Sequence, residues 1–269
     1  MRGDTREPVA SIDAALAALA ATPVSDEGIH DARKAIKKAR AALRVMREGL
    51  GETRYRTENE ALRDAGRCLA PVRDAKSLSA AFESMRDSGP SARERGRIDK
   101  ALAARRSASR RELDRSAQLH ECIRLLQDSR GRVARWSTGA LRSVPAAKGI
   151  ERIHRAGRKA FAVARRSRTP EALHEWRKQV KYLMNALDMT GEHAMPGADE
   201  MRADAGKLAS LLGDDHDFAQ LRRFLAGKPA GGEAANANMR RRLERQRAKL
   251  QKQAFVVGAR LYGKQAVTG

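Results

Sequence analysis

The chain has few of the residues on which several common protein classes depend. It contains only two cysteines, Cys68 and Cys122, in no CxxC spacing, and aromatic residues make up 4% of its 269 positions. Two separated cysteines exclude a disulfide framework and fit reduced, buried thiols in a cytosolic protein. No apolar run approaches the roughly 20 residues of a membrane helix. There is also no GxGxxG or Walker-type loop, and no alternating pattern typical of strands.

What the chain does contain favours helices. Its 41% hydrophobic content is mainly Ala, Leu and Val, which are mixed with abundant Arg, Glu and Lys, and these residues favour helix over strand. Breaks rich in Gly, Pro and Ser fall at 25–28, 87–91, 137–149, 190–200 and 226–236. They separate about ten helical segments. We therefore predict an all-α fold.

Charge is the strongest global feature of the sequence. The 55 Lys and Arg exceed the 33 Asp and Glu, which gives a net charge of +22 and a pI near 11.0. This excess is more than solubility needs, and its positive charges repel one another in the folded protein. It therefore predicts a polyanionic partner. Nucleic acid, anionic lipid and linear phosphate polymers are all partners of this kind.

One basic segment occurs twice. IHDARKAIKKARAAL starts at residue 29 and LHEWRKQVKYLMNAL at residue 173, which places His30 opposite His174 at an offset of 144. Further along, LAPVRDAKSL from Leu69 aligns with LGDDHDFAQL from Leu212 at an offset of 143. A shared order with a nearly constant offset predicts two related halves, each a helical bundle.

Drawn as helices, both copies separate an apolar seam from a basic stripe. The first seam is Ile29, Ala32, Ile36, Ala39, Leu43 and Met46; its stripe is His30, Arg33, Lys34, Lys37 and Arg44, with Arg40 at the edge. The second seam is Leu173, Trp176, Val180, Leu183 and Leu187; its stripe is His174, Arg177, Lys178 and Lys181. A third helix, from Ile150, places Arg155, Arg158, Lys159 and Arg165 opposite Ile153, Gly157, Phe161 and Ala164.

These stripes favour a bound anion. Like charges three and four residues apart repel by a few tenths of a kcal/mol per pair, so each stripe destabilises its own helix unless an anion is present. The alternative is that the stripes are ordinary solvated faces. Three such helices, two of them matched residue for residue, make that alternative the weaker one.

HDARKAIKKARAALRVM and HEWRKQVKYLMNALDM resemble the two signature helices of the CHAD family, the conserved histidine α-helical domain. PVRDAKSL, LLGDDHDFAQL and the terminal MRRRLERQRAKLQKQAFVVGARLY resemble its later segments. The resemblance implies one domain over 8–263, made of two antiparallel four-helix bundles (about 8–136 and 149–263) related by a pseudo-twofold axis. A linker, 137–149, joins them, and a basic groove between them binds inorganic polyphosphate.

The resemblance also implies which residues bind. The positions carried over are His30, Arg33, Lys34, Lys37, Arg40, Arg44, Arg155, Arg158, Lys159, His174, Arg177, Lys178 and Lys181. The sequence departs from the pattern at Met184 and Asp188, which stand opposite Arg40 and Arg44. We expect His30 and His174 to become charged donors beside a polyanion, so that affinity rises at mildly acidic pH.

The predicted role is non-enzymatic binding in the cytoplasm at polyphosphate granules, with no catalytic residue, metal, cofactor or membrane partner. One alternative is nucleic-acid binding, and we expect it to be non-specific only, because Trp176 and Phe161 fall on core seams. Another is a metal-dependent phosphohydrolase that uses the acidic GDDHDF segment from Gly213. We instead expect Asp214 or Asp215 to cap a helix, with His216 near the ligand.

Overall fold

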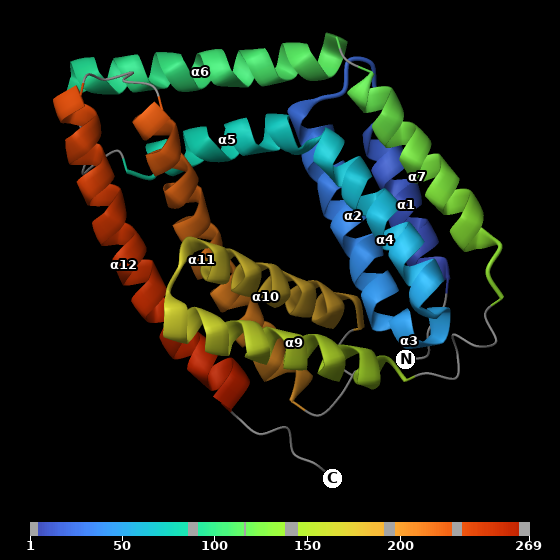
Figure 1. The fold of residues 1–269 in the computed structure, drawn as a ribbon. Helices are drawn as coiled ribbons and strands as arrows, with labels where there is room; N and C mark the ends of the chain where they lie inside the picture. Colours follow the sequence, from blue (N-terminus) through green and yellow to red (C-terminus); the bar gives the residue numbers. More distant parts are fainter. Residues whose placement is uncertain are drawn as a thin grey trace.

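The computed structural model describes residues 5–85, 91–115, 117–137, 145–190, 197–227 and 233–263. Within these ranges the regular structure consists of eleven helices and no strand, which confirms the all-α fold class. The helices form an open frame (Figure 1). Three hydrophobic cores hold this frame together.

The first core lies within the first half of the chain. Four helices surround it: α1 (Arg6–Ala18), α2 (Asp26–Val45), α4 (Glu52–Cys68) and α7 (Gln118–Ala134). The short α3 (Arg47–Leu50) connects α2 to α4. Ile12, Leu62 and Leu126 are fully buried here, and removing such side chains from water is the main favourable term in folding.

The second core lies in the second half of the chain. It is formed by α9 (Ala146–Ser167) and α10 (Pro170–Thr190) together with parts of α11 (Ala198–Gly227) and α12 (Glu233–Gly263). Half of the chain's ten Trp, Tyr and Phe side chains lie in it, around Trp176, Phe161 and Phe255. Val45, the last residue of α2, also packs here, so the first half contributes to the core of the second.

A third core joins the two halves and was not anticipated from the sequence. Leu78 of α5 (Ala70–Glu83) and Ile98 of α6 (Ala92–Arg115) pack with Leu221 of α11 and Leu243 of α12. The two last helices reach this core because they are 30 and 31 residues long. Between them, α5 and α6 span the frame opposite α9 and α10 (Figure 1).

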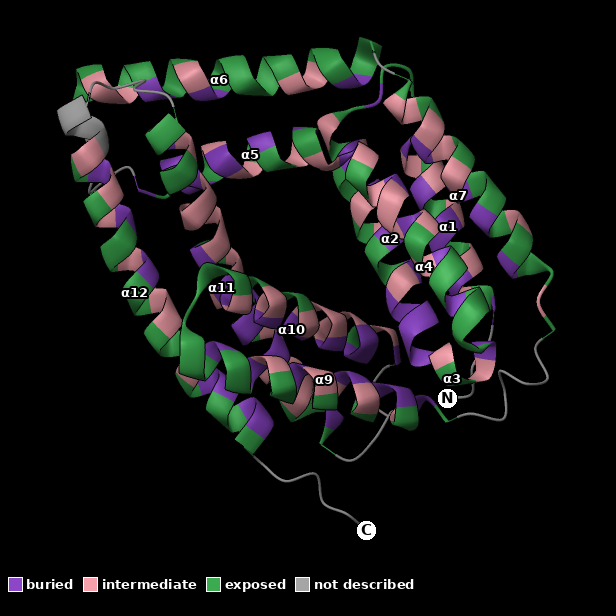
Figure 2. Ribbon diagram, in the orientation of Figure 1, coloured by how far each residue is buried: buried purple, intermediate pink, exposed green. Residues whose placement is uncertain are grey.

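The apolar seams predicted from helical spacing are confirmed. Every residue of the seam on α2 is at most 5% exposed, and so is every seam residue of α10. Helix α2 begins at a Ser25 N-cap, whose Oγ accepts a 2.9 Å hydrogen bond from the Gly28 amide and so satisfies one of the free N–H groups of the first turn. Buried and exposed residues alternate along these helices with the helical period (Figure 2).

The start of α9 is fixed against the end of α2. Helix α9 begins at Ala146, so the last residues of the predicted linker are helical, while residues 138–144 lie outside the described ranges. A Cβ at Gly149 would lie 2.3 Å from the carbonyl oxygen of Val45. Only glycine permits this backbone approach, which brings Arg152 of α9 against α2.

Candidate anion-binding site

Helices α2 and α10, which carry the two copies of the basic segment, pack against each other. Arg33 and Lys37 on α2 lie within electrostatic range of Arg177 and Lys181 on α10. Arg73 on α5 also acts on both lysines. These five residues are called the central cluster below, and four of them belong to the predicted stripes.

The pKa of Lys37 shows that the cations of the central cluster repel one another. Loss of hydration lowers the pKa of its ammonium to about 8, and the nearby cations, Lys181 first, lower it as well. Lys37 is nevertheless exposed to solvent. Water therefore screens part of this repulsion.

Arg33 and Arg177 occupy equivalent positions of the repeat. Each has one side-chain nitrogen without a hydrogen-bond partner among the described residues. Arg33 donates from Nη1 to the carbonyl oxygen of Gly66. Its Nε, and the Nε of Arg177, are buried and have no hydrogen-bond partner among the described residues. Burial lowers the pKa of both guanidinium groups. Buried donors of this kind are rarely left unpaired in a native protein unless something else supplies the acceptor.

Two carboxylates lie near the central cluster and offset part of its charge. Asp74 raises the pKa of Arg33 and Arg177, and Asp217 raises that of Lys181. Burial raises the pKa of Asp217 itself, although neighbouring cations oppose the shift. Five cations against two carboxylates leave a net positive charge.

Two clefts lie near α10. One of about 360 Å³, called the second cleft below, opens beside the central cluster between α10, α11 and α12. The rings of His174 and His216 lie 5.2 Å apart in its wall, next to Arg177 and Arg223. Burial lowers the pKa of His216 to about 4, and the nearby cations contribute. The pKa of His174 is also lowered, mainly by burial. Both rings are therefore neutral near pH 7 and available to take up a proton.

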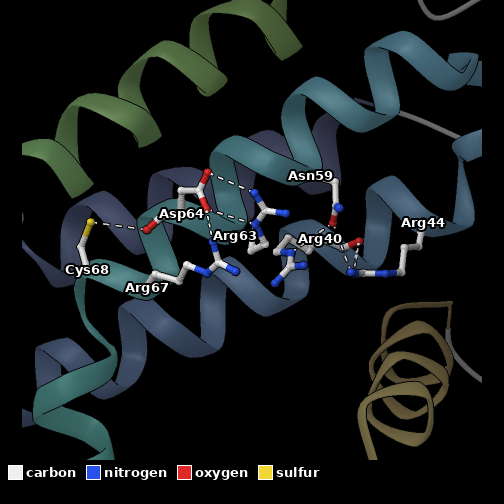
Figure 3. A network of polar contacts seen from close by, with 7 residues as sticks. All are labelled: Arg40, Arg44, Asn59, Arg63, Asp64, Arg67 and Cys68. Atoms are coloured by element: carbon white, nitrogen blue, oxygen red, sulfur yellow. Dashed lines mark hydrogen bonds and ion pairs between the residues drawn. The ribbon is translucent and has the colours of Figure 1, made fainter. Parts of the chain in front are cut away.

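A cleft of about 400 Å³, the first cleft, lies on the other side of α10. Arg40 and Arg44 of α2 and Lys178 of α10, which belong to the predicted stripes, line it. Asn59 of α4 holds the two arginines: its Oδ1 accepts from Arg40 Nε and from Arg44 Nη2, each at 3.1 Å (Figure 3). Arg44 is only 8% exposed.

The remaining predicted binding residues lie outside the central cluster and the two clefts. His30 and Lys34 are exposed on the first part of α2, and Arg155, Arg158 and Lys159 are exposed on α9. None of these five lines either cleft.

Sequence reasoning missed several residues of the site. Arg47, Arg63 and Arg152 line the first cleft, and Arg223 lines the second. They lie outside the repeat, so no pattern in the sequence marked them. Arg73 and His216 were signalled, because they occupy equivalent places in the aligned segments of the two halves.

The acidic segment from Gly213 has a different role from the one predicted. Asp214 and Asp215 do not cap a helix, because α11 runs through them without a break. Asp215 is 4% exposed, and its Oδ1 accepts hydrogen bonds from Arg247 Nε at 3.0 Å and Gln251 Nε2 at 2.9 Å. Within the described ranges, no three His, Cys, Asp or Glu side chains are grouped as metal ligands.

A family model, the CHAD domain, matches residues 10–226. The chain belongs to the CHAD family. The match takes in both signature helices, α2 and α10, and ends within α11, so that α12 lies beyond it. No curated protein sequence matches this CHAD protein. None of its helices, in the part of the chain that the structure describes, is long and apolar enough to span a membrane.

Proposed function

We propose that this CHAD protein binds inorganic polyphosphate without cleaving it, in a basic groove between two halves related by a pseudo-twofold axis. The family is associated with polyphosphate binding. In this proposal the single domain covers 8–263, and its halves each contribute one signature helix. Action in the cytoplasm at polyphosphate granules belongs to the same proposal.

The observation that carries the proposal is the matched pair Arg33 and Arg177. They occupy equivalent positions on α2 and α10, and each has a buried Nε with no partner among the described residues. Phosphate oxygens of one bound chain would supply both missing acceptors. Because an arginine can hold two phosphate oxygens in a planar fork, the pair suits this ligand better than two lysines would.

The geometry of the stripes fits a linear polyanion. Polyphosphate is a flexible chain of phosphates with no bases to recognise, so its receptor needs cations at short intervals along a line. Neighbours on a helix stripe lie about 5 to 6 Å apart, and packed helices lie about 8 to 10 Å apart. Two facing stripes would therefore form a trough in which Lys37 and Lys181 contact the same segment of ligand. The full set proposed to bind consists of the positions carried over from the family resemblance in the sequence analysis, with Arg73 and His216 added.

Nucleic acid is the nearest alternative ligand, and the aromatic residues argue against it. Proteins that hold single strands stack the bases on accessible aromatic rings. The chain has two Trp, three Tyr and five Phe, all within the described ranges, and each of them is buried or half-buried. Non-specific contact with a nucleic-acid backbone would remain.

One titration tests the proposal. Binding of size-fractionated polyphosphate is compared with binding of DNA, RNA and orthophosphate at the same salt concentration, and repeated at increasing salt. We expect polyphosphate to bind most tightly, with a log–log salt slope of several units, at roughly 0.7 to 0.9 per contact by analogy with nucleic acids. A slope near zero, or tighter binding of nucleic acid, would contradict the proposal. Orthophosphate release, measured with and without Mg²⁺ or Mn²⁺, should stay at background.

A further inference from the structure

The first cleft differs from the central cluster in how its charges are arranged. Six cations line it: Arg40, Arg44, Arg47, Arg63, Arg152 and Lys178. They come from five different helices, α2, α3, α4, α9 and α10, and no carboxylate is part of the lining. The central cluster offers cations along a line, whereas these converge on one space from several directions.

Among the described residues, half of these cations make no ion pair with a carboxylate. Arg47, Arg63 and Lys178 are paired at the rim with Glu52, Asp64 and Glu175. In the described part of the chain, the hydrogen bonds of the other three end on neutral oxygens. Arg40 donates to Asn59, Arg44 to Asn59 and the Arg40 carbonyl, and Arg152 to the Arg44 carbonyl.

Arg44 makes this arrangement costly without a ligand. It is 8% exposed, so its charge has lost most of its hydration, and it makes no ion pair with any described carboxylate. Burial also lowers the pKa of Arg40 and of Arg152, and for each the largest further effect is a neighbouring guanidinium, Arg44 and Arg47 respectively. An anion in the cleft would offset the buried positive charge of Arg40, Arg44 and Arg152.

The cationic side chains are also held in place before a ligand arrives. The guanidinium carbon of Arg44 lies 3.6 Å from the ring centre of Tyr182, and that of Arg47 lies 4.6 Å from the ring centre of Tyr55. Such stacking, together with the Asn59 bridge in Figure 3, fixes the planes of the donors. A fixed, convergent set of donors favours a compact ligand, because little ordering is left to be lost on binding.

The ligand that matches this set is a terminal phosphate. An internal phosphate of a chain has a single ionisable oxygen, whereas a terminal one has a second that ionises near pH 6, as in a phosphate monoester. We propose that the first cleft is the part of the binding site that takes doubly charged terminal phosphate groups, from the end of a polyphosphate chain or from a short free oligophosphate. This inference rests on the proposed function and deepens it, because it distinguishes ends from the middle of the chain.

The test compares phosphates with and without ends. Calorimetric titration would use linear tripolyphosphate, cyclic trimetaphosphate, which has no terminal group, and long polyphosphate with its ends free or blocked as phosphoramidates. We expect the wild type to bind tripolyphosphate at least about tenfold more tightly than trimetaphosphate. Arg152→Gln should remove that preference. Weaker binding of end-blocked chains would identify chain ends as the ligand; equal binding would identify free oligophosphates.

Controls separate this proposal from diffuse charge and from the proposed function. Arg166→Gln, at an exposed position on α9, removes the same charge and should retain the preference. If Arg152→Gln fails to fold, Arg63→Gln replaces it, since the side chain of Arg63 hydrogen-bonds, among the described residues, to the partly exposed Asp64 alone. Undiminished preference in the cleft variants would overturn the cleft proposal, even if long chains still bind. Failure of the wild type to bind long chains would instead overturn the proposed function.

Discussion

Lys181 of α10 is the cation that most lowers the pKa of Lys37 on α2. The two residues occupy equivalent positions of a repeat whose copies are separated by 144 residues, and the fold brings them together where the halves meet. Neither ammonium makes an ion pair with a described carboxylate. Two lysines held in mutual repulsion are most simply explained by an anion that both of them contact.

Charge reversal at either lysine should impair polyphosphate binding. Lys37→Glu or Lys181→Glu removes a charge-assisted contact of roughly 1.5 to 3 kcal/mol and adds repulsion toward the ligand, so we expect affinity to fall at least about tenfold. Folding should change little, because each substitution also relieves repulsion within the central cluster. Fluorescence titration with long polyphosphate measures the first effect, and thermal unfolding the second.

Lys38→Glu is the matched control for charge reversal. Lys38 neighbours Lys37 in sequence but points to α1, where its Nζ lies 2.9 Å from Glu7 Oε1. The substitution changes the net charge equally and breaks an exposed ion pair of small value. Equal loss of affinity in all three variants would mean that net charge, and not the position of these lysines, determines binding.

Affinity should decrease as pH rises above 8. The free protein loses the Lys37 proton near its pKa of about 8, whereas bound polyphosphate stabilises the charged form and raises that pKa. Lys37→Arg should reduce the decrease, because arginine keeps its charge, and Lys34→Arg serves as a control. Without ligand, the depressed pKa predicts the opposite trend for stability. The unfolded chain binds more protons between pH 8 and 10.5, so stability rises over that range.

Acidic pH should strengthen binding through the second cleft. His216, with a pKa of about 4, and His174, whose pKa is also lowered, are neutral at pH 7 in the free protein. A polyanion favours their charged forms, so binding takes up protons and affinity rises as pH falls below 6.5. Each pKa unit gained on binding adds up to about tenfold. Titrations with long polyphosphate at stepwise lower pH should show a flatter trend for His174→Gln and His216→Gln.

His120, exposed on α7, provides the control for this pH dependence. His120→Gln should follow the wild type. Stability without ligand should change in the opposite sense to affinity, decreasing as pH falls from 6.5 toward 4, because the unfolded chain then binds more protons than the folded one. A pH profile of affinity that is identical in wild type and both second-cleft variants would remove these histidines from the site.

The sequence predicted the parts of this fold that depend on local periodicity. The seams of α2, α9 and α10 were readable because each helix buries one face along its whole length. The third core was not, because α11 changes partner along its length: Leu208 packs in the second core and Leu221 in the third. A helix that turns different faces to different cores shows no single stripe.

The candidate site, too, was predictable from the sequence only in part. Arg33, Lys37, Arg177 and Lys181 were predicted because the repeat marked them twice. Arg152 was missed because its place in the first cleft follows from the contact of Gly149 with Val45, which joins residues about a hundred positions apart. No spacing within one segment records such a contact.

The ion pair of Asp215 with Arg247 should be a major contributor to stability. The two residues are 4% and 7% exposed, and Asp215→Ala would remove the buried carboxylate of the pair, which leaves the guanidinium of Arg247 with the longer 3.5 Å contact to Glu244. Breaking a buried pair from one side costs about 3 to 5 kcal/mol, which chemical denaturation measures. Asp214→Ala is the control. Asp214 is exposed, so its replacement should change the free energy of unfolding by no more than about 0.5 kcal/mol. In the double variant Asp215→Leu with Arg247→Met, apolar side chains replace both charges, so much of the lost stability should return. If Asp215→Ala were as stable as Asp214→Ala, the pair would not hold α11 to α12.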